Sequence, residues 1–368
     1  MSKSYCSLGL MSGTSADGVD ASIIQSDGDN EFKVILDKYF VYNQEIYKTI
    51  HELKEEVSEL KDLQNFAEKV NLLEKKITLF HVDVVHQIMR ECKLEVDLIG
   101  FHGQTIFHNS AEKISKQLGD GKLLSKNTKK TVIYNFRQND LRNGGSGAPL
   151  TPIFHKLLKI KFKIKDATFV NIGGITNITS ISNTNDMLGA DVGPGMCLID
   201  RWLREKINKN FDKDGIIAES GNVNEKILGQ LLKNFYEKEK KLASDKIQSL
   251  DTKHFDLSLV KKLSLEDGAA TLTEFTAQII ISALNLNKFN NAEIILCGGG
   301  RNNKFLFKKI KKKNSKIKLI DEYGINGDFV ESQAFAYLAI RSFLNLPISF
   351  PKTTGVDKPC VGGTIIKN

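Results

Sequence analysis

The chain has 368 residues, of which 41% are hydrophobic and 26% charged. This length and composition predict a folded protein with room for two domains, each with its own core, and argue against disorder. No run of 18 or more apolar residues occurs, so we expect no membrane span, and the N-terminus lacks the pattern of a secretory signal peptide.

The charge balance is basic, with 52 Lys and Arg residues against 44 Asp and Glu residues and a net charge of +8. The densest basic run, Lys304–Lys318, interleaves lysines with apolar residues. This interleaving predicts a helix with a solvated lysine face, so we expect no nucleic-acid partner. The five cysteines are widely spaced and odd in number, which favours a reducing, cytoplasmic compartment.

Two strand–turn–strand units predict hairpins in the two halves of the chain. The first spans Ser7–Ile24, with a polar turn at Ser12–Gly18. The second spans Ala167–Ile181, with Gly173 and Gly174 at its centre. Because the two units begin about half a chain apart, we interpret them as a weak internal repeat and predict two similar domains.

Strands and helices alternate over the rest of the chain. Apolar residues at steps of three and four predict helical structure, in one helix or two over 63–91 and in later helices. The expected elements are a helical stretch at 63–91, a buried strand at 96–102, a helix at 272–284, a strand at 292–297 and a helix at 331–345. The alternation predicts α/β sheets in both halves.

Two other segments stand apart from this alternation. Asn143–Pro149 is rich in glycine, and we interpret it as a hinge or cleft loop between the halves. Lys233–Lys246 is rich in Lys and Glu and is typical of an exposed helix.

Glycine-rich turns follow strands at Gly13–Gly18, Gly173–Gly174 and Gly298–Gly300. Glycine lets backbone N–H groups approach an anion closely, so several such turns favour nucleotide binding. The P-loop, the dinucleotide-binding fingerprint and the protein-kinase motifs are missing from the sequence. The remaining interpretation is a two-domain fold in which hairpins from both halves bind ATP phosphates in a cleft.

The first turn carries hydroxyl and carboxylate side chains suited to a nucleotide. Thr14 and Ser15 would donate hydrogen bonds to phosphate, and Asp17 and Asp20 would hold Mg²⁺ directly or through water. The alternative for Asp17 is a turn-forming role before Gly18.

Asp191 lies between glycines, ahead of Gly193–Gly195 and of a helix expected to begin near Met196. A carboxylate on a rigid loop suits a general base that a substrate can reach. The alternative is an N-cap, although Asp191 lies several residues early for that role. Asp200, further along the helix, is interpreted as structural.

Together these segments closely resemble the anhydro-N-acetylmuramic acid kinase family, in the family's order over nearly the whole chain. The matching segments are Gly9–Asp20, Gly100–His108, Phe136–His155, Val170–Thr179, Gly189–Gly195, Cys297–Asn303 and Gly327–Ala339.

The resemblance implies an α/β, actin/hexokinase-like (ribonuclease H-like) fold with an ATP cleft between two domains. The expected domains are 1–165 and 166–330, with the tail 331–368 packing back on the first. Enzymes of this family use ATP and water to open the ring of 1,6-anhydro-N-acetylmuramic acid. They yield N-acetylmuramic acid 6-phosphate in peptidoglycan recycling. A cytoplasmic homodimer is expected.

The resemblance also implies roles for individual residues, with Asp191 as the catalytic base and the loop Gly13–Asp20 at ATP. The residues expected to bind ATP are Gly13, Thr14, Ser15, Ala16, Asp17, Gly18, Val19, Asp20, Gly173, Gly174, Gly298, Gly299, Gly300 and Asn303. Those expected to contact the sugar substrate are His102, Gln104, Arg137, Gly193, Pro194, Gly195 and Glu331.

The chain departs from the family pattern at three positions. Asn135 stands where Asp is usual, Ala190 where an aromatic residue is frequent, and Met196 where Asn is usual. Two alternatives stay open: a kinase of the same fold that acts on another sugar, and an ATP-dependent sensor without catalysis. The intact Asp191 argues against the sensor, which needs no base.

Overall fold

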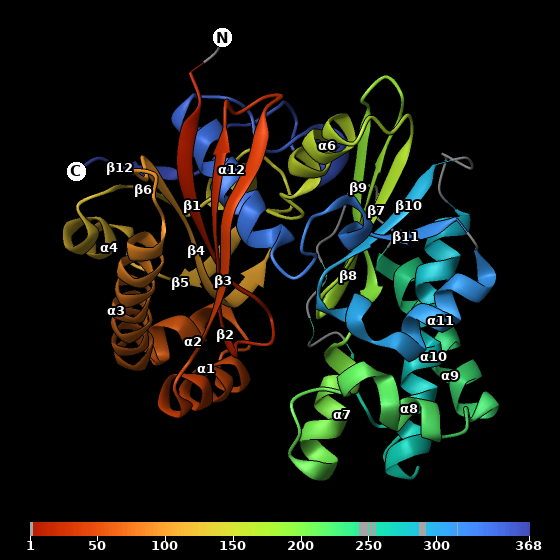
Figure 1. The fold of residues 1–368 in the computed structure, drawn as a ribbon. Coiled ribbons are helices and arrows are strands. Elements are labelled where there is room, and N and C mark those ends of the chain that lie inside the picture. The colour runs from red at the N-terminus through yellow and green to blue at the C-terminus, as the bar shows by residue number, and fades with distance from the viewer. Residues whose placement is uncertain (1–2, 243–249, 251, 253–254, 287–291, 315) are drawn as a thin grey trace. The chain divides into compact units, whose positions relative to one another are not determined.

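The computed structural model in Figure 1 describes every residue except 1–2, 243–249, 251, 253–254, 287–291 and 315. The chain divides into two compact units. Unit 1 comprises Met1–Lys163 and Asp328–Asn368, and unit 2 comprises Ile164–Gly327. The chain therefore passes from one unit to the other twice.

The sheet of unit 1 is built on an antiparallel meander followed by parallel strands. Its strands, in order across the sheet, are β12 (Thr364–Ile366), β6 (Thr131–Tyr134), β4 (Leu98–Asn109), β1 (Tyr5–Ser12), β2 (Gly18–Ser26) and β3 (Phe32–Val41), with β5 (Ile114–Leu118) paired to β4. Strands β1, β2 and β3 are antiparallel neighbours, whereas β4 runs parallel to β1 and β6 parallel to β4.

The sheet of unit 2 repeats this topology. Its strands, in order, are β11 (Ile317–Leu319), β10 (Glu293–Cys297), β7 (Ala167–Ile172), β8 (Ile175–Ile181) and β9 (Met187–Pro194). Again three antiparallel strands come first, and two parallel strands extend the sheet beyond the first of them. This repeat confirms the two predicted hairpins and the duplicated α/β architecture of an actin/hexokinase-like fold.

Helices cover the sheets of both units (Figure 1). Those of unit 1 are α1 (Gln44–Glu56), α2 (Leu60–Asn65), α3 (Ala67–Glu91), α4 (Gly121–Thr128), α5 (Gln138–Arg142), α6 (Pro152–Lys161), α12 (Val330–Phe343) and α13 (Pro351–Thr354). Those of unit 2 are α7 (Cys197–Ile207), α8 (Ile216–Ser220), α9 (Glu225–Leu242), α10 (Leu265–Asn285) and α11 (Lys304–Lys313).

Helix α12 packs on β1, β2 and β4 at very short range. A Cβ atom at Gly9 would lie 1.9 Å from the carbonyl oxygen of Ser332, and one at Gly100 would lie 2.3 Å from that of Phe335. The helix therefore contacts the strand backbone directly, and its buried Ala336 fits this close packing.

The core of unit 2 contains the fully buried Trp202, whose indole N–H donates to the Leu265 carbonyl at 2.9 Å.

The helical stretch predicted at 63–91, as one helix or two, is two helices that meet at Phe66. Other predictions hold only in part. The basic run is not one helix, because α11 ends at Lys313 and the buried Ile317 pairs with Ile294 in the sheet. Part of the exposed helix expected at 233–246 belongs to α9, while 243–246 fall outside the described residues.

The segment Asn143–Pro149, which the sequence predicts to be a hinge or cleft loop between the halves, belongs to unit 1. The Ser146 N–H donates to the Thr354 carbonyl at 2.7 Å, and the Gly147 N–H donates to the carboxylate of buried Asp140 at 2.7 Å. These bonds hold the segment against the C-terminal part of its own unit. Among the described residues, no helix is both long and apolar enough to span a membrane.

Buried histidines make the stability of unit 1 sensitive to acid. Burial lowers the pKa of His81 to about 4 and that of His155 to about 3. The unfolded chain takes up these protons near pH 6.5, whereas the folded chain resists them until lower pH. The free energy of unfolding should therefore fall as the pH falls from about 6.5 toward 4.

We predict that His81→Phe removes part of this dependence. Between about pH 7.5 and 5 its free energy of unfolding should fall by roughly 2 kcal/mol less than that of the wild type, measured by urea denaturation. His86 on the same helix is exposed, so His86→Asn should keep the wild-type dependence. Identical pH dependence in His81→Phe and wild type would contradict the neutral, buried state of His81.

Candidate active site

The turn between β1 and β2 is closed by its own backbone and by Ser12. The Ala16 N–H donates to the Gly13 carbonyl at 3.2 Å, and the Ser12 hydroxyl donates to the Gly18 carbonyl at 2.9 Å. Ala16 is buried at the tip of the turn with a φ of 55°. Gly18, Val19 and Asp20 then begin β2, and the side chain of Val19 is buried in the core.

Side chains from outside the turn hold its carbonyl groups. Gln104 Nε2 donates to the Gly13 carbonyl at 3.1 Å, and Lys54 Nζ donates to that of Thr14 at 2.9 Å. His51 Nε2 lies 3.1 Å from the Ser15 carbonyl. By contrast, the N–H groups of Thr14 and Ser15 have no hydrogen-bond partner among the residues that the structure describes. A turn with its carbonyls held and its N–H groups available is suited to an anion.

Gly13 leaves the face of this turn open, because a Cβ atom there would have nothing within 4 Å. Gly18 differs, since its Cβ would lie 2.4 Å from the Phe40 carbonyl oxygen. Thr14 and Ser15 are exposed, but the Ser15 hydroxyl already donates to Asp17 at 2.6 Å. Within the turn, the Thr14 hydroxyl is thus the better donor for a bound ligand.

Carboxylates gather beside this turn. Burial, followed by the charges of Glu331, Asp17, Asp328 and Asp37, raises the pKa of Asp20 to about 8. Strands β2 and β3, the turn and the start of α12 supply these side chains. Asp17, Asp20 and Glu331 were expected at a ligand site from the sequence, whereas Asp328 was not singled out.

The donor chemistry of this acidic cluster fits Mg²⁺. Within the described residues, no group of three or more His, Cys, Asp or Glu side chains could hold a metal ion unaided. Mg²⁺ in phosphate-transfer sites typically uses one or two carboxylates together with phosphate oxygens and water. A divalent cation would also relieve the repulsion and burial that disfavour the charged form of Asp20.

His102 and Arg137 contact each other. Arg137 donates from Nη2 to His102 Nε2 at 3.0 Å and from Nη1 to the Gly147 carbonyl at 2.8 Å. His102 Nδ1 lies 2.7 Å from the Gly103 carbonyl, and burial, together with the Arg137 charge, keeps its pKa well below the usual range. Neutral His102 uses both ring nitrogens inside the protein, so it orients Arg137. Gln104 likewise holds a neighbouring group, because its side chain donates to the Gly13 carbonyl.

In unit 2, the turn Gly173–Gly174 is fastened to the start of α7. The Gly173 carbonyl accepts from Met196 N–H at 2.8 Å, and the Gly174 carbonyl accepts from Gly195 N–H at 2.9 Å and Cys197 N–H at 3.2 Å. A Cβ at Gly195 would lie 2.2 Å from the Gly173 carbonyl oxygen. Glycine at 195 thus allows the hairpin to satisfy the first N–H groups of the helix.

Asp191 lies on strand β9, opposite Asn177 of β8, and not on the loop that the sequence predicted. The third strand of the meander extends through Gly193 to Pro194, with a register shift at Thr176/Asn177. Half-buried Asp191 accepts the Leu250 N–H at Oδ2, at 2.9 Å. An N-cap role is excluded, because Met196 is the N-cap residue of α7.

The three glycines after β10 differ in their surroundings. A Cβ at Gly298 would lie 2.4 Å from Asn171 Oδ1, and one at Gly300 would lie 2.3 Å from Ile172 Cγ2. A Cβ at Gly299 would have nothing within 4 Å. Asn303, expected near adenosine, caps α11, because its Oδ1 accepts the Leu306 N–H at 2.9 Å.

Two of the three departures from the family pattern have a local explanation. Asn135 has a φ of 55°, a left-handed conformation that both Asn and Asp can adopt. The Met196 side chain is buried in the core of unit 2. Nothing in the structure explains Ala190, which is exposed.

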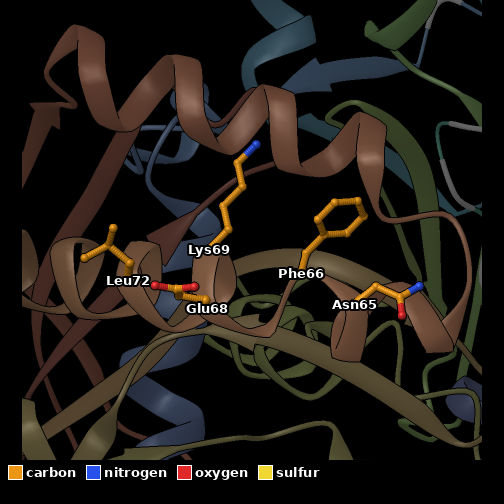
Figure 2. Close-up of a pocket in the computed structure, with 5 residues that line it drawn as sticks. All are labelled: Asn65, Phe66, Glu68, Lys69 and Leu72. Atoms are coloured by element: carbon orange, nitrogen blue, oxygen red, sulfur yellow. The ribbon is translucent and has the colours of Figure 1, made fainter.

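A surface hollow of about 370 Å³ lies elsewhere, on α2 and α3 (Figure 2). It is lined by Asn65, Phe66, Glu68, Lys69 and Leu72. None of the predicted site residues belongs to it, so we do not assign the active site to this hollow.

Comparisons with known proteins agree with these motifs. Residues 5–368 match the family model described as anhydro-N-acetylmuramic acid kinase. A Pelagibacter ubique (strain HTCC1062) protein with that name is 51% identical, with 100% of both chains covered. A Methylobacterium nodulans protein with the same name is 36% identical, with 97% of this chain and 98% of the relative covered.

Among solved structures, a similar chain is the Acidaminococcus fermentans (R)-2-hydroxyglutaryl-CoA dehydratase component A. It is 11% identical with a TM-score of 0.43, covers 92% of this chain and 98% of its own, and is too distant to bear on function. The family model and the relatives, which span nearly the whole chain, decide the assignment. The chain belongs to the anhydro-N-acetylmuramic acid kinase family.

Proposed function

We propose that the chain phosphorylates 1,6-anhydro-N-acetylmuramic acid with ATP and opens its anhydro ring with water. The products would be N-acetylmuramic acid 6-phosphate and ADP, in the recycling of peptidoglycan. Beside family membership, the observation that supports the proposal most is the acidic cluster that adjoins a turn suited to phosphate in unit 1. A second is Asp191 on β9 of unit 2.

The proposed phosphate site is the turn Gly13–Asp17. The N–H groups of Thr14 and Ser15 would donate to phosphate oxygens, together with the Thr14 hydroxyl. The turn Gly173–Gly174 would provide the second phosphate contact. The Gly298–Gly300 turn would lie on the adenosine side, with Gly299 as its open position, and Asn303 would support it as a helix cap.

Asp17 and Asp20 would hold Mg²⁺, directly or through water, with Glu331 and Asp328 close to Asp20. The cation, when bound, neutralises charge that develops on the transferred phosphoryl group. These carboxylates would keep the cation beside the phosphates of the turn.

Asp191 is the proposed general base. The 6-oxygen of the substrate bridges to the anomeric carbon and carries no proton, so it is a poor nucleophile until the bridge opens. Asp191 would take a proton from water as the water oxygen attacks C1, and the C1–O6 bond would break with its electron pair left on O6. O6 would then attack the γ-phosphorus, ADP would leave, and Asp191 would return its proton to solvent.

Arg137 is the proposed contact for the lactyl carboxylate or for phosphate, since its guanidinium is charged and half-buried. His102 and the Gly147 carbonyl would fix its orientation. Arg142 is exposed and is a second candidate.

The use of ATP and the lack of any disulfide suit a cytoplasmic enzyme. Light scattering, which measures the mass of the particle in solution, would test the proposed homodimer.

A phosphoryl-transfer assay tests the substrate directly. We expect turnover with 1,6-anhydro-N-acetylmuramic acid and a product identified by mass as the 6-phosphate. Transfer to ordinary hexoses alone would favour another sugar kinase, and ATP binding without any transfer would favour a sensor.

We predict that Gly13→Val sharply weakens ATP binding while unit 1 stays folded. Apart from the two chain neighbours, no protein atom lies within 4 Å of a Cβ at position 13, so the new side chain extends into the space proposed for phosphate. Isothermal titration with ATP measures the affinity. Gly229→Val is a matched control, because Gly229 on α9 is equally open. Equal ATP affinity in Gly13→Val and wild type would refute the assigned phosphate site.

We predict that Asp191→Asn folds, binds ATP and sugar, and loses turnover by roughly 10²–10⁴-fold or more. Asn is nearly the same size, but it cannot accept a proton from water at neutral pH. In ¹⁸O-water the wild type should place the label on C1 of the product. Label on the transferred phosphate, or near-normal turnover of the variant, would rule out this mechanism even if the kinase activity is real.

A further inference from the structure

Arg301 is a buried cation in unit 2 that directly follows the Gly298–Gly300 turn, and only 5% of it is exposed. Its guanidinium donates from Nε to Asp321 Oδ2 at 2.7 Å and from Nη2 to Asp321 Oδ1 at 2.8 Å. The pair is bidentate, and Arg301 holds the pKa of Asp321 below its usual range. Sequence reasoning did not single out either residue.

The same guanidinium also holds the glycine turn. Arg301 Nη1 donates to the Gly298 carbonyl at 3.1 Å, and the Gly298 N–H donates to the Gly327 carbonyl at 3.2 Å. Gly327 packs against the guanidinium so closely that a Cβ there would lie 2.2 Å from Arg301 Nε. Arg301 thus joins three backbone segments: the turn, the 3₁₀ turn Ile320–Tyr323 with Asp321, and the segment that ends unit 2 at Gly327.

The strand β7 supports the turn from another direction. Gly298 and Gly300 press against Asn171 and Ile172 at the end of that strand, while Gly299 faces open space. Arg301 is buried, whereas 41% of the Asp321 side chain is exposed. Ion pairs with an exposed partner add little net stability, so stability alone is a poor reason for this arrangement. A planar guanidinium that binds three backbone segments is better explained by a need to hold those segments in fixed positions.

We propose that Arg301 is a positioning residue for the nucleotide: it holds the Gly298–Gly300 turn so that the backbone at Gly299 is presented to the ligand. This inference depends on the proposed function, which assigns that turn to the adenosine side. Arg301 is committed to protein partners and acts through the turn, without contacting the nucleotide. The expected consequence is a loss of nucleotide affinity that leaves the sugar site unaffected.

The test uses the full-length protein and ADP with Mg²⁺ in isothermal titration, followed by steady-state kinetics. Arg301→Lys keeps the charge but cannot form the bidentate fork, so we expect its Kd for ADP and its KM for ATP to rise at least about tenfold. The KM for the sugar and kcat should change less than about threefold. Asp321→Asn keeps the size of its side chain and should weaken ADP binding by a smaller factor.

Lys309→Met is the matched control. Lys309 on α11 pairs with Glu274 of α10 at 2.8 Å, in the same unit, and among the described residues it makes no bond to the glycine turn. It should bind ADP as the wild type does. Thermal melting of each variant identifies those that stay folded, and Asp321→Asn carries the test if Arg301→Lys does not fold.

The possible outcomes distinguish a failure of the proposed function from a failure of the positioning role alone. A wild type that binds no ADP would overturn the proposed function together with this inference. A wild type that binds ADP, with folded Arg301→Lys and Asp321→Asn binding it equally well, would overturn the inference alone. A fall in kcat together with a rise in both KM values would show general damage and would also overturn a positioning role.

Discussion

The direct packing of α12 on the backbone of β1 and β4 is the constraint on which the site of unit 1 depends. Glycine at positions 9 and 100 lets the helix approach until its carbonyls meet the strands. The Ser332 and Ser22 hydroxyls then lie 2.6 Å apart, and Gln333 Nε2 donates to Asp37 at 3.0 Å. This registry fixes the first turn of the helix, so the charge of Glu331 acts on Asp20 and helps to raise its pKa. The C-terminal segment of unit 1 supplies Asp328 and Glu331 to the cluster because glycines at positions 9 and 100 let α12 pack directly on the strands.

Glycines at the candidate site serve two different purposes. Gly18, Gly195, Gly298 and Gly300 are packed against other backbone or side-chain atoms, so any side chain would displace the protein itself. At Gly13 and Gly299 a side chain would extend into open space. The sequence motif does not separate the two kinds of position, because both are occupied by glycine. The structure separates them: among these six glycines, Gly13 and Gly299 are the positions at which the backbone faces open space.

The sequence was sufficient for local elements and insufficient for contacts across the fold. Alternation and glycine turns predicted both hairpins, and periodicity predicted α3, α10 and α12. The strand position of Asp191 was missed because a strand ending in glycine and proline looks like a loop until its partner β8 is known. Likewise, Lys54 and His51 hold a turn that lies 36 to 40 positions earlier, and no local pattern signals this contact. Asp328 was missed because its importance depends on where α12 begins.

The second passage between the units gives Arg301 a wider significance. Gly327, which packs on Arg301, is the last residue of unit 2, and Asp328 begins the segment that returns to unit 1. Only Asp328, Phe329 and Val330 separate Gly327 from Glu331 in the chain. A short segment of the chain thus connects the Arg301 site of unit 2 with Glu331 in the acidic cluster of unit 1. An insertion in this segment would therefore change the spacing in the chain between the two sites while leaving the side chains of both sites unaltered.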